Sequence, residues 1–251
     1  MVREEIEEYL YFAMSIGEKM LISGAEVGRG EDTISRICYA YGAKKVDVLS
    51  MNNAIITTVE LEDREVLTQT KRISGLHIDL DRLDRLNCLS RKICERRLPA
   101  EDIRKEFDGI CQGKGYSFGV QLFASALISG AFAAFFGGTV RDLLVSALIG
   151  IVLKCTEEFL VRQKTNSFVT ILLCSCLGGL LANLAVMAQV GNQVDMISLG
   201  NIILFIPGVV FVNSMRDMFS KDIVTGLVGF VESSLTTMVM AMGFALSNLW
   251  F

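Results

Sequence analysis

Residues 201–222, NIILFIPGVVFVNSMRDMFSKD, combine an apolar run, a helix break and a cluster of polar side chains. Proline removes a backbone donor and clashes with the carbonyl one turn earlier, so a helix is expected to kink or part at Pro207-Gly208. Inside a bilayer, such a break survives only where protein or a water-filled cavity satisfies the freed backbone groups. The stretch therefore predicts a broken helix in a membrane protein.

Three polar side chains follow this break at helical spacing. Asn213, Arg216 and Asp217 lie at positions i, i+3 and i+4, so one helix face presents an amide, a guanidinium and a carboxylate together. This face favours the substrate path of a membrane transporter. It also fits a kinked helix that ends in an ordinary charged cap at the membrane interface, because cytosolic loops usually carry such charges.

Charged residues are concentrated in the first half of the chain. Of 24 basic and 28 acidic residues, only six and seven, respectively, lie at or beyond Phe118. A Gly-rich segment, GKGYSFG at 113–119, marks the change in composition. We therefore predict an α-helical polytopic membrane protein with a cytosolic α+β domain at 1–112 and a transmembrane domain at 113–251.

Composition also argues against several classes of function. The net charge of −4 and the lack of a basic patch interleaved with aromatics give no case for nucleic acid. The seven cysteines form no CxxC pair, which indicates reduced thiols. His77 is the only histidine, so we expect no metal site, no Ser-His-Asp triad and no cofactor. The acidic N-terminus, MVREEIEEYL, is typical of neither a signal peptide nor a transit peptide.

Hydrophobic periodicity in the first half changes from helical to strand-like and back. Gly24 and Gly42 are expected to end the first two helices. The predicted elements are helices at 4–21 and 30–41, strands at 46–51, 54–61 and 64–70 with a turn at Glu62-Asp63, and helices at 79–97 and 101–111.

A membrane-spanning helix needs about 20 apolar residues. The weakest candidate carries Lys154, Glu157 and Glu158 at its end. Small residues recur at four-residue spacing, which favours a packed bundle; they are Ala126, Gly130 and Ala134, Ser175 and Gly179, and Gly178 and Ala182. The five predicted spans are 118–136, 140–160, 167–189, 197–215 and 223–247.

Basic residues between the predicted spans indicate the orientation of the chain. Only Arg141 falls on the outer side if the N-terminal domain is cytosolic, and this asymmetry follows the positive-inside rule. We therefore expect a multi-pass plasma-membrane protein in contact with lipid, with its N-terminus in the cytosol and its C-terminus outside. The basic residues on the inner side are Lys154, Arg162, Lys164, Arg216 and Lys221.

Glu232 is the tenth residue of the last predicted span, in GLVGFVESSLTT. Carboxylates inside a membrane are costly and usually mark a substrate or proton path. Gly226, Gly229, Ser233 and Thr236 flank it, so we expect its face to point into the bundle, where burial would raise its pKa. A carboxylate bonded to a neighbouring hydroxyl, or one in a contact with a partner, is the alternative.

Five stretches together resemble the threonine/serine exporter (ThrE-like) family, over nearly the whole chain. The resemblance implies a cytosolic domain followed by membrane spans, and export of small amino acids driven by the proton motive force. Family members occur as fused proteins or as two polypeptides, and this chain resembles the longer polypeptide of the split form. The stretches are GEKMLISGAEVGRGEDTISRICYAYG (17–42), NNAIITTVE (52–60), TQTKRISG (68–75), LDRLNCLSRKI (83–93) and IPGVVFVNSMRDMFSKDIVTGL (206–227).

The split form implies a smaller integral-membrane partner subunit and a hetero- or homo-oligomer. Because related two-component systems are associated with dicarboxylate export, the substrate stays open between threonine or serine and dicarboxylates such as succinate. The family's motif positions correspond here to Gly24, Ala25, Glu26, Arg72, Ser90, Arg91, Pro207, Gly208, Asn213, Arg216 and Asp217.

We infer roles for the motif residues that follow the helix break. Asn213 and the backbone freed near Pro207 are placed to hold the ammonium and carboxylate groups of a substrate. Asp217 and Arg216 are placed to form a gate at the cytosolic mouth.

Two other functions are weighed against transport. In the first, the N-terminal domain is a hydrolase that uses Ser23, Glu26 or Ser90, but only the motif-like SGAE favours it. The sequence has no G-x-S-x-G elbow, catalytic Cys–His pair or phosphate-binding loop, so we predict no enzyme. In the second, the chain is a regulatory or scaffold subunit whose N-terminal domain senses a cytosolic ligand and whose spans dock a channel-forming partner.

Overall fold

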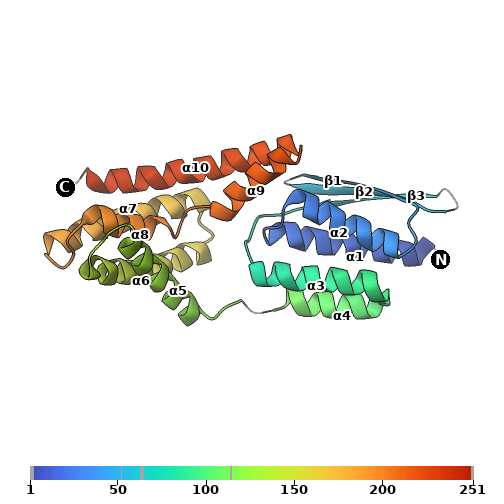
Figure 1. Cartoon of the computed structure of the whole chain (residues 1–251), viewed down its shortest axis with the longest axis horizontal. Coiled ribbons are helices and arrows are strands. Elements are labelled where there is room, and N and C mark those ends of the chain that lie inside the picture. Colours follow the sequence, from blue (N-terminus) through green and yellow to red (C-terminus); the bar gives the residue numbers. More distant parts are fainter. Residues whose placement is uncertain (1–2, 52, 63–64, 114, 250–251) are drawn as a thin grey trace. The chain divides into compact units, whose positions relative to one another are not determined.

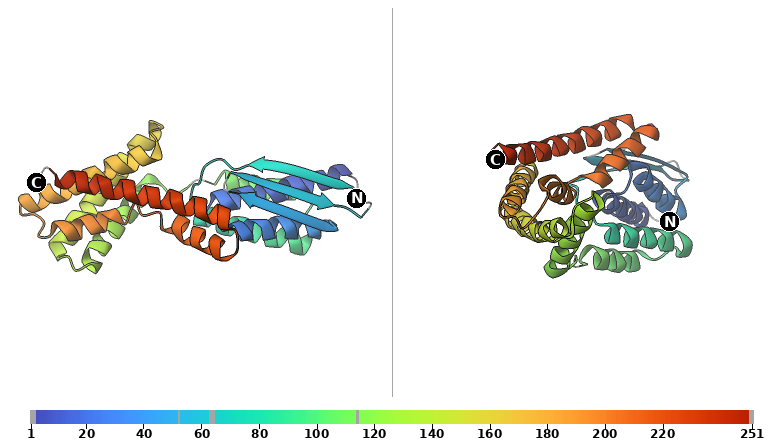
Figure 2. Two further views of the ribbon diagram at one scale, coloured as in Figure 1. Left: turned by 90° about the horizontal axis from the view of Figure 1, so that it is seen from above. Right: turned by 60° about the vertical axis from the view of Figure 1, so that its left-hand side comes forward.

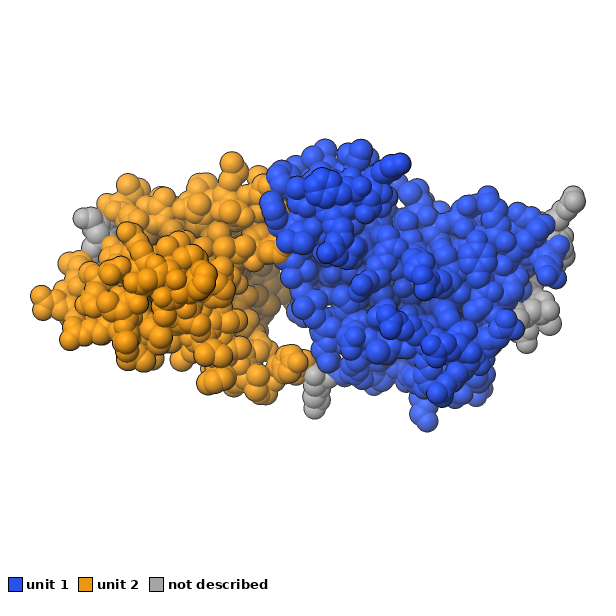
Figure 3. All heavy atoms as spheres, viewed as in Figure 1, with its two compact units in different colours: residues 1–114, 209–231 blue, residues 115–208, 232–251 orange. Residues whose placement is uncertain are grey.

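A computed structural model of the chain describes residues 3–51, 53–62, 65–113 and 115–249. The chain divides into two compact units (Figure 3). The first contains residues 1–114 together with 209–231, and the second contains residues 115–208 together with 232–251. Each unit is described by itself below.

The first unit contains a three-stranded antiparallel sheet and two layers of helices. The strands follow the order β1-β2-β3, with Thr57 of β2 paired to Val48 of β1 and to Gln69 of β3 (Figure 2). Helices α1 and α2 form the middle layer. The sheet packs against one side of this layer, and α3 packs against its other side (Figure 1). The elements are α1 (Arg3–Ile22), α2 (Val27–Ala40), β1 (Lys45–Met51), β2 (Ala54–Glu60), β3 (Val66–Arg72), α3 (Leu80–Arg96) and α4 (Ala100–Cys111).

This order of helices and strands confirms the one predicted from periodicity. Gly24 and Gly42 have φ of 101° and 91°, as expected for glycines that end helices. The second helix begins at Val27 rather than Gly30. Asp63, in the predicted hairpin turn, lies outside the described residues.

One apolar core joins α1 to the rest of this domain. Gly17 of α1 allows close packing of α2, because a Cβ at this position would lie 2.5 Å from the Cδ1 atom of Ile34. The long amphipathic helix α1 is therefore the central element of the domain. The largest fully buried side chains of this core are Leu10, Met14, Ile16, Met20, Ile34, Ile37, Ile55, Leu86, Ile93 and Ile103.

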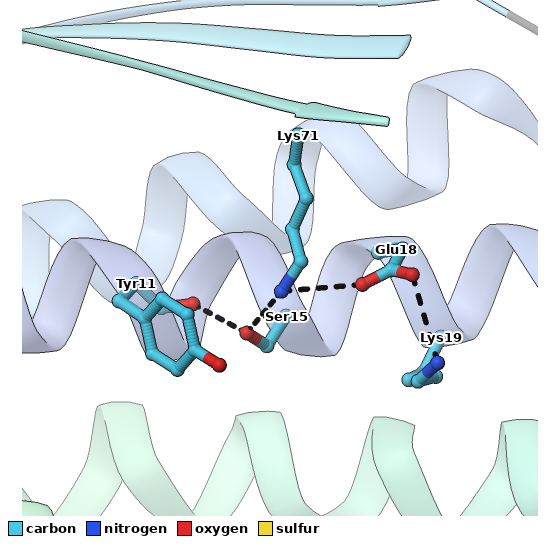
Figure 4. A network of polar contacts seen from close by, with 5 residues as sticks. All are labelled: Tyr11, Ser15, Glu18, Lys19 and Lys71. Atoms are coloured by element: carbon cyan, nitrogen blue, oxygen red, sulfur yellow. Dashed lines mark hydrogen bonds and ion pairs between the residues drawn. The ribbon is translucent and has the colours of Figure 1, made fainter. Parts of the chain in front are cut away.

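A polar network fastens the last strand to α1 (Figure 4). Lys71 of β3 donates from Nζ to Ser15 Oγ at 2.5 Å and pairs with Glu18 Oε2 at 3.2 Å. The same ammonium lies 4.7 Å from the centre of the Tyr11 ring. With these partners the half-buried cation is satisfied, which makes the network a structural link.

The remaining helices include the predicted membrane spans. Within the described residues, α5, α7 and α10 are long and apolar enough to cross a membrane. Helix α6 has 23 residues but carries the charged end that the sequence predicted to weaken it. The elements are α5 (Phe118–Phe135), α6 (Val140–Arg162), α7 (Ser167–Met187), α8 (Val194–Ile202), α9 (Gly208–Phe219) and α10 (Ile223–Asn248).

The predicted break at Pro207-Gly208 separates two helices. Helix α8 ends at Ile202 and α9 begins at Gly208, so the predicted span at 197–215 is not one continuous helix. At 1.5 Å of rise per residue, the nine residues of α8 are about 13 Å long, well short of the roughly 30 Å of a hydrocarbon core. The break predicted from proline chemistry is confirmed.

Glycines bring the helices of the second unit close together, as the small-residue spacing predicted. A Cβ on Gly130 of α5 would lie 3.0 Å from the carbonyl oxygen of Leu143 in α6. A Cβ on Gly179 of α7 would lie 1.9 Å from Ser247 Oγ in α10. Because neither position has room for a side chain, these residues fix how near the helices lie.

A fully buried carboxylate joins the start of α6 to the loop before α8. One oxygen of Asp142 accepts from Thr139 N at 2.9 Å and Thr139 Oγ1 at 2.7 Å, and the other accepts from Asn192 N at 2.7 Å and Gln193 N at 3.0 Å. Thr139 and Asp142 form a capping box. The T-x-x-D pattern at 139–142 predicts this cap, but sequence spacing gives no sign of the contact with residues 192–193.

We expect Asp142→Ala to destabilise the protein, because it leaves the backbone amides of Thr139, Asn192 and Gln193 without their acceptor. The loss of a charged acceptor predicts a decrease of about 2–4 kcal/mol in the free energy of unfolding. Thermal unfolding of the purified full chain in detergent tests this. Asp195→Ala, which removes an exposed carboxylate from α8, is the matched control. Equal unfolding temperatures for the two variants would show that the hydrogen bonds of Asp142 contribute nothing to stability.

Candidate functional site

The candidate site is formed by the α1–α2 turn and helix α9, both within the first unit. The turn, residues 23–26, is held by backbone bonds from His77 N to Ile22 O at 2.9 Å and from Asp79 N to Ser23 O at 3.1 Å. Glu26 is the N-cap of α2, but its side chain makes no capping hydrogen bond. The first amides of α2 therefore need an acceptor from elsewhere.

Helix α9 supplies partners for this turn from its polar face. Asn213 Nδ2 donates to Gly24 O at 2.8 Å, and Val27 N donates to Asp217 Oδ1 at 3.3 Å. Arg216 Nη1 forms a short ion pair with Glu26 Oε1. Three side chains that share a helix face thus bind three nearby positions, and we call this set of contacts the α9 latch.

Each contact of the α9 latch satisfies a group at the end of a helix. The carboxylate of Asp217 lies at the positive end of the α2 dipole and accepts from its first amide. The amide of Asn213 binds a carbonyl that follows the last turn of α1. Since these partners are 189 and 190 residues apart, the latch provides long-range tertiary contacts at the two ends of the turn.

The surroundings of Asp217 disfavour the charged form of its carboxyl group. Burial raises its pKa above the ordinary value of 3.8, and the neighbouring carboxylates of Asp222 and Glu26 raise it further. The hydrogen bond from Val27 and the charge of Arg216 act in the opposite direction. Burial also raises the pKa of Glu31, one turn into α2, and the charges of Asp222 and Asp217 add to this effect.

Helix α10 holds α9 on its other side. A Cβ on Gly226 would lie 2.6 Å from Ser214 O, and a Cβ on Gly229 would lie 2.3 Å from Ser214 Oγ. The rings of Phe211 and Phe230 are 5.5 Å apart. The sequence analysis placed these glycines beside Glu232 in a bundle, whereas the structure uses them to pack α10 against α9.

Two further motif residues lie at the helix break. Pro207 is half-buried, and a side chain at Gly208 would meet no atom within 4 Å. Close packing of α9 against another element therefore does not require a glycine at position 208.

The other N-terminal motif residues differ in their surroundings. Ala25 is half-buried within the turn, and Arg72 and Arg91 are exposed. Ser90 is buried and donates to Asn87 O at 2.8 Å, a bond within α3. Among the contacts of the described residues, none connects these last three residues to the latch.

The hydrolase hypothesis finds no catalytic arrangement in the described residues. The hydroxyl of Ser23 is fully buried, and that of Ser90 is bound to a backbone carbonyl. No base contacts either one there, and no three His, Cys, Asp or Glu side chains of the described chain gather as a metal site. A nucleophile needs a neighbouring base, and these serines lack one.

Glu232 does not lie where the sequence analysis expected. Its side chain is exposed, while that of the adjacent Ser233 is buried. The expectation that its face points into the bundle is therefore wrong for the bundle that this chain forms.

Known proteins match this chain over nearly its whole length. The family model described as "Putative threonine/serine exporter" (ThrE) matches residues 11–248. The chain belongs to the ThrE family. This match includes the α1–α2 turn, the helix break and all three side chains of the α9 latch.

Two curated relatives share low identity with the chain. A "Threonine/serine exporter" of Corynebacterium glutamicum is 23% identical over 93% of this chain and 49% of its own length. The "Probable succinate transporter subunit YjjP" of Klebsiella aerogenes is 22% identical over 92% of this chain and 90% of its own length. The chain thus spans about half of the first relative and nearly all of the second. No solved structure matches it.

We expect Asp217→Ala to loosen the start of α2, because the amide of Val27 loses its acceptor. Hydrogen–deuterium exchange of the purified full chain, read on peptides that cover residues 24–30, is expected to accelerate about fivefold, corresponding to roughly 1 kcal/mol. Asp32→Ala, which removes an exposed carboxylate from the same helix, is the control. Unchanged exchange in Asp217→Ala would show that the latch does not hold the turn.

The raised pKa values of Asp217 and Glu31 predict a pH dependence of stability. A carboxyl group whose pKa is raised by folding contributes stability that is complete below its unfolded pKa and is lost as pH rises through its folded pKa. The ordinary pKa values are 3.8 for Asp217 and 4.5 for Glu31. Thermal stability is therefore expected to fall as the pH rises above these values. Asp217→Asn and Glu31→Gln should flatten this fall, whereas Asp32→Asn should not.

Proposed function

We propose that the chain is a subunit of a secondary exporter of small amino acids, with threonine and serine as the first candidate substrates. The observation that carries this is the α9 latch, a polar face directly after a helix break that is bound to the N-terminal domain. Membership of the ThrE family and the name of the Corynebacterium relative support the substrate class. Transport requires no catalytic group, so we propose no enzymatic activity.

The latch acts as a gate in this proposal. Residues 203–207 are non-helical and connect α8 to α9. Helix α9 leaves the turn when its three contacts break, and this exposes the amide of Asn213 and the guanidinium of Arg216 to a substrate. An amino acid carries a carboxylate for Arg216 and an ammonium group for the carboxylate of Asp217, so the substrate replaces two of the three latch contacts.

The carboxyl group of Asp217 is the proposed site of proton coupling at this gate. Because burial raises the pKa of Asp217, the latched state binds a proton more readily than the open state does. This difference in proton affinity is the proposed link between α9 and a proton gradient. The charged groups around the carboxyl are Glu26 and Glu31 of the domain, and Arg216 and Asp222 of the segment that carries it.

The transporter is proposed to need a second membrane chain. This chain covers 49% of an exporter but 90% of a transporter subunit, so the other half of the exporter is supplied by a smaller integral-membrane partner. We propose five membrane crossings in the plasma membrane, a cytosolic N-terminus and an external C-terminus. In this arrangement α6 and the broken α8–α9 segment add two crossings to α5, α7 and α10.

Two alternatives have specific support. Export of a dicarboxylate such as succinate is favoured by the name of the Klebsiella relative. A regulatory or scaffold role is favoured by the latch itself, because its polar side chains contact the N-terminal domain rather than a cavity. In that case the domain senses a cytosolic ligand, and the partner alone forms the path.

The deciding experiment is efflux of preloaded threonine, serine and succinate from cells that express this chain with and without the partner, with a protonophore control. Protonophore-sensitive efflux that needs both chains supports the proposal, and the exported solute identifies the substrate. Absence of efflux of all three, with both chains present in the membrane, would overturn it in favour of the regulatory role.

Variants of the latch connect transport to this site. Asn213→Ala and Asp217→Asn are expected to lower efflux at least tenfold, because each removes a group that both the latch and the substrate require. Asp32→Asn serves as the matched control, and membrane insertion is checked for all variants. Wild-type efflux in both latch variants would remove α9 from the substrate path.

A further inference from the structure

A second polar cluster lies in the other unit, where α5, α6 and α8 contact one another. It consists of Ser129 of α5, Ser146 of α6 and Asn201 of α8. All three side chains are fully buried where these helices pack together. None of them is a motif residue of the family resemblance or part of the α9 latch.

The hydrogen-bond donors of Ser146 and Asn201 are already used within the cluster. Asn201 Nδ2 donates to Ile197 O at 2.8 Å and to Ser146 Oγ at 3.2 Å. The hydroxyl of Ser146 has acceptors in Ser129 O at 3.0 Å and Ile197 O at 3.4 Å. The orientation of the Asn201 amide is therefore fixed, with its nitrogen bound and its oxygen pointing elsewhere.

Two oxygens of the cluster have no partner in the described structure. They are Asn201 Oδ1 and Ser129 Oγ, both fully inaccessible. A buried amide oxygen without a hydrogen bond costs on the order of a few kcal/mol, and a membrane offers no bulk water to relieve it. Because an amide oxygen can only accept, it requires a donor or a cation.

Two glycines pack against the hydroxyl and carbonyl oxygens of this cluster. A Cβ on Gly200 would lie 2.5 Å from Ser129 O and 2.6 Å from Ser146 Oγ. A Cβ on Gly150 would lie 2.4 Å from Ser129 Oγ and 2.9 Å from Ser125 O. The sequence thus leaves out two side chains beside the hydroxyl and carbonyl oxygens of the cluster.

The cluster also lies at the end of a broken helix. Asn201 is the residue before the last of α8, and non-helical residues follow Ile202. The C-terminal end of a helix carries partial negative charge, and in discontinuous membrane helices such ends coordinate monovalent cations. The break at Pro207 therefore produces an electronegative helix end beside the unpartnered oxygens.

We propose that this cluster is a sodium-binding site, with Asn201 Oδ1 and Ser129 Oγ as side-chain ligands and neighbouring carbonyl oxygens of α5 as further ligands. The ligands are neutral oxygens without a carboxylate, which suits a monovalent cation and not Ca²⁺ or Mg²⁺. Broken helices in membrane proteins coordinate Na⁺ at helix ends of this kind, which is why sodium is the proposed ion. The site goes beyond the proposed export function, and its binding test does not depend on transport.

The test is the thermal unfolding of the purified full chain in detergent, with 200 mM NaCl, KCl or choline chloride at equal ionic strength. Sodium is expected to raise the apparent Tm by about 3 °C over the other two salts, since a bound ligand stabilises the folded state. Ser129→Ala should abolish this difference. Ser175→Ala, which removes another fully buried hydroxyl from α7 of the same unit, should retain it.

Equilibrium binding of ²²Na⁺ keeps the proposal testable if a variant unfolds. Wild-type protein should bind the ion with saturation, and excess NaCl but not KCl should displace it. Equal Tm values in NaCl and KCl together with no saturable ²²Na⁺ binding would overturn the site and assign the two oxygens to a buried water. Saturable binding that persists in Ser129→Ala and Asn201→Ala would place the ion elsewhere and also overturn the assignment.

Discussion

The hydrogen bond between the amide of Val27 and the carboxylate of Asp217 connects the first 30 residues to a helix more than 180 residues later. A helix leaves its first amides unsatisfied, and the N-cap Glu26 of α2 does not satisfy them with its own side chain. The fold of the N-terminal domain therefore includes a group from the segment that follows the helix break. Asn213 and Arg216 extend the same dependence to Gly24 and Glu26, which precede Val27 in the turn.

The helix break explains how one segment can serve both halves of the chain. If residues 197–215 formed a single helix, α8 and α9 would continue along one axis and α9 could not turn independently. Proline at 207 removes that constraint, so α8 can pack on α5, α6 and α7 while α9 contacts the α1–α2 turn. The same break leaves Asn201 at a helix end, which is why the α9 latch and the Asn201 cluster both adjoin it.

Local chemistry made much of this predictable from the sequence. Periodicity located the helices and strands of the first domain, glycines marked the ends of α1 and α2, and Pro207 marked the break. Tertiary contacts were not predictable in this way, because spacing relates residues only within one element. The i, i+3, i+4 pattern grouped Asn213, Arg216 and Asp217 correctly, yet nothing in it indicates that the partners are Gly24, Glu26 and Val27. For the same reason Gly226 and Gly229 were assigned to the wrong neighbour.

Glu232 and Asp142 differ in how their carboxylates are accommodated by the chain. Glu232 is the only charged residue of α10, and the apolar residues Val231 and Leu235 beside it are also exposed. A carboxylate facing the centre of a bilayer costs on the order of 3 kcal/mol, a penalty that contact with polar groups of another protein removes. In contrast, Asp142 is fully satisfied by its own chain. The chain thus satisfies the carboxylate of Asp142 with its own backbone and hydroxyl groups, whereas it leaves the carboxylate of Glu232 at the surface of the described structure.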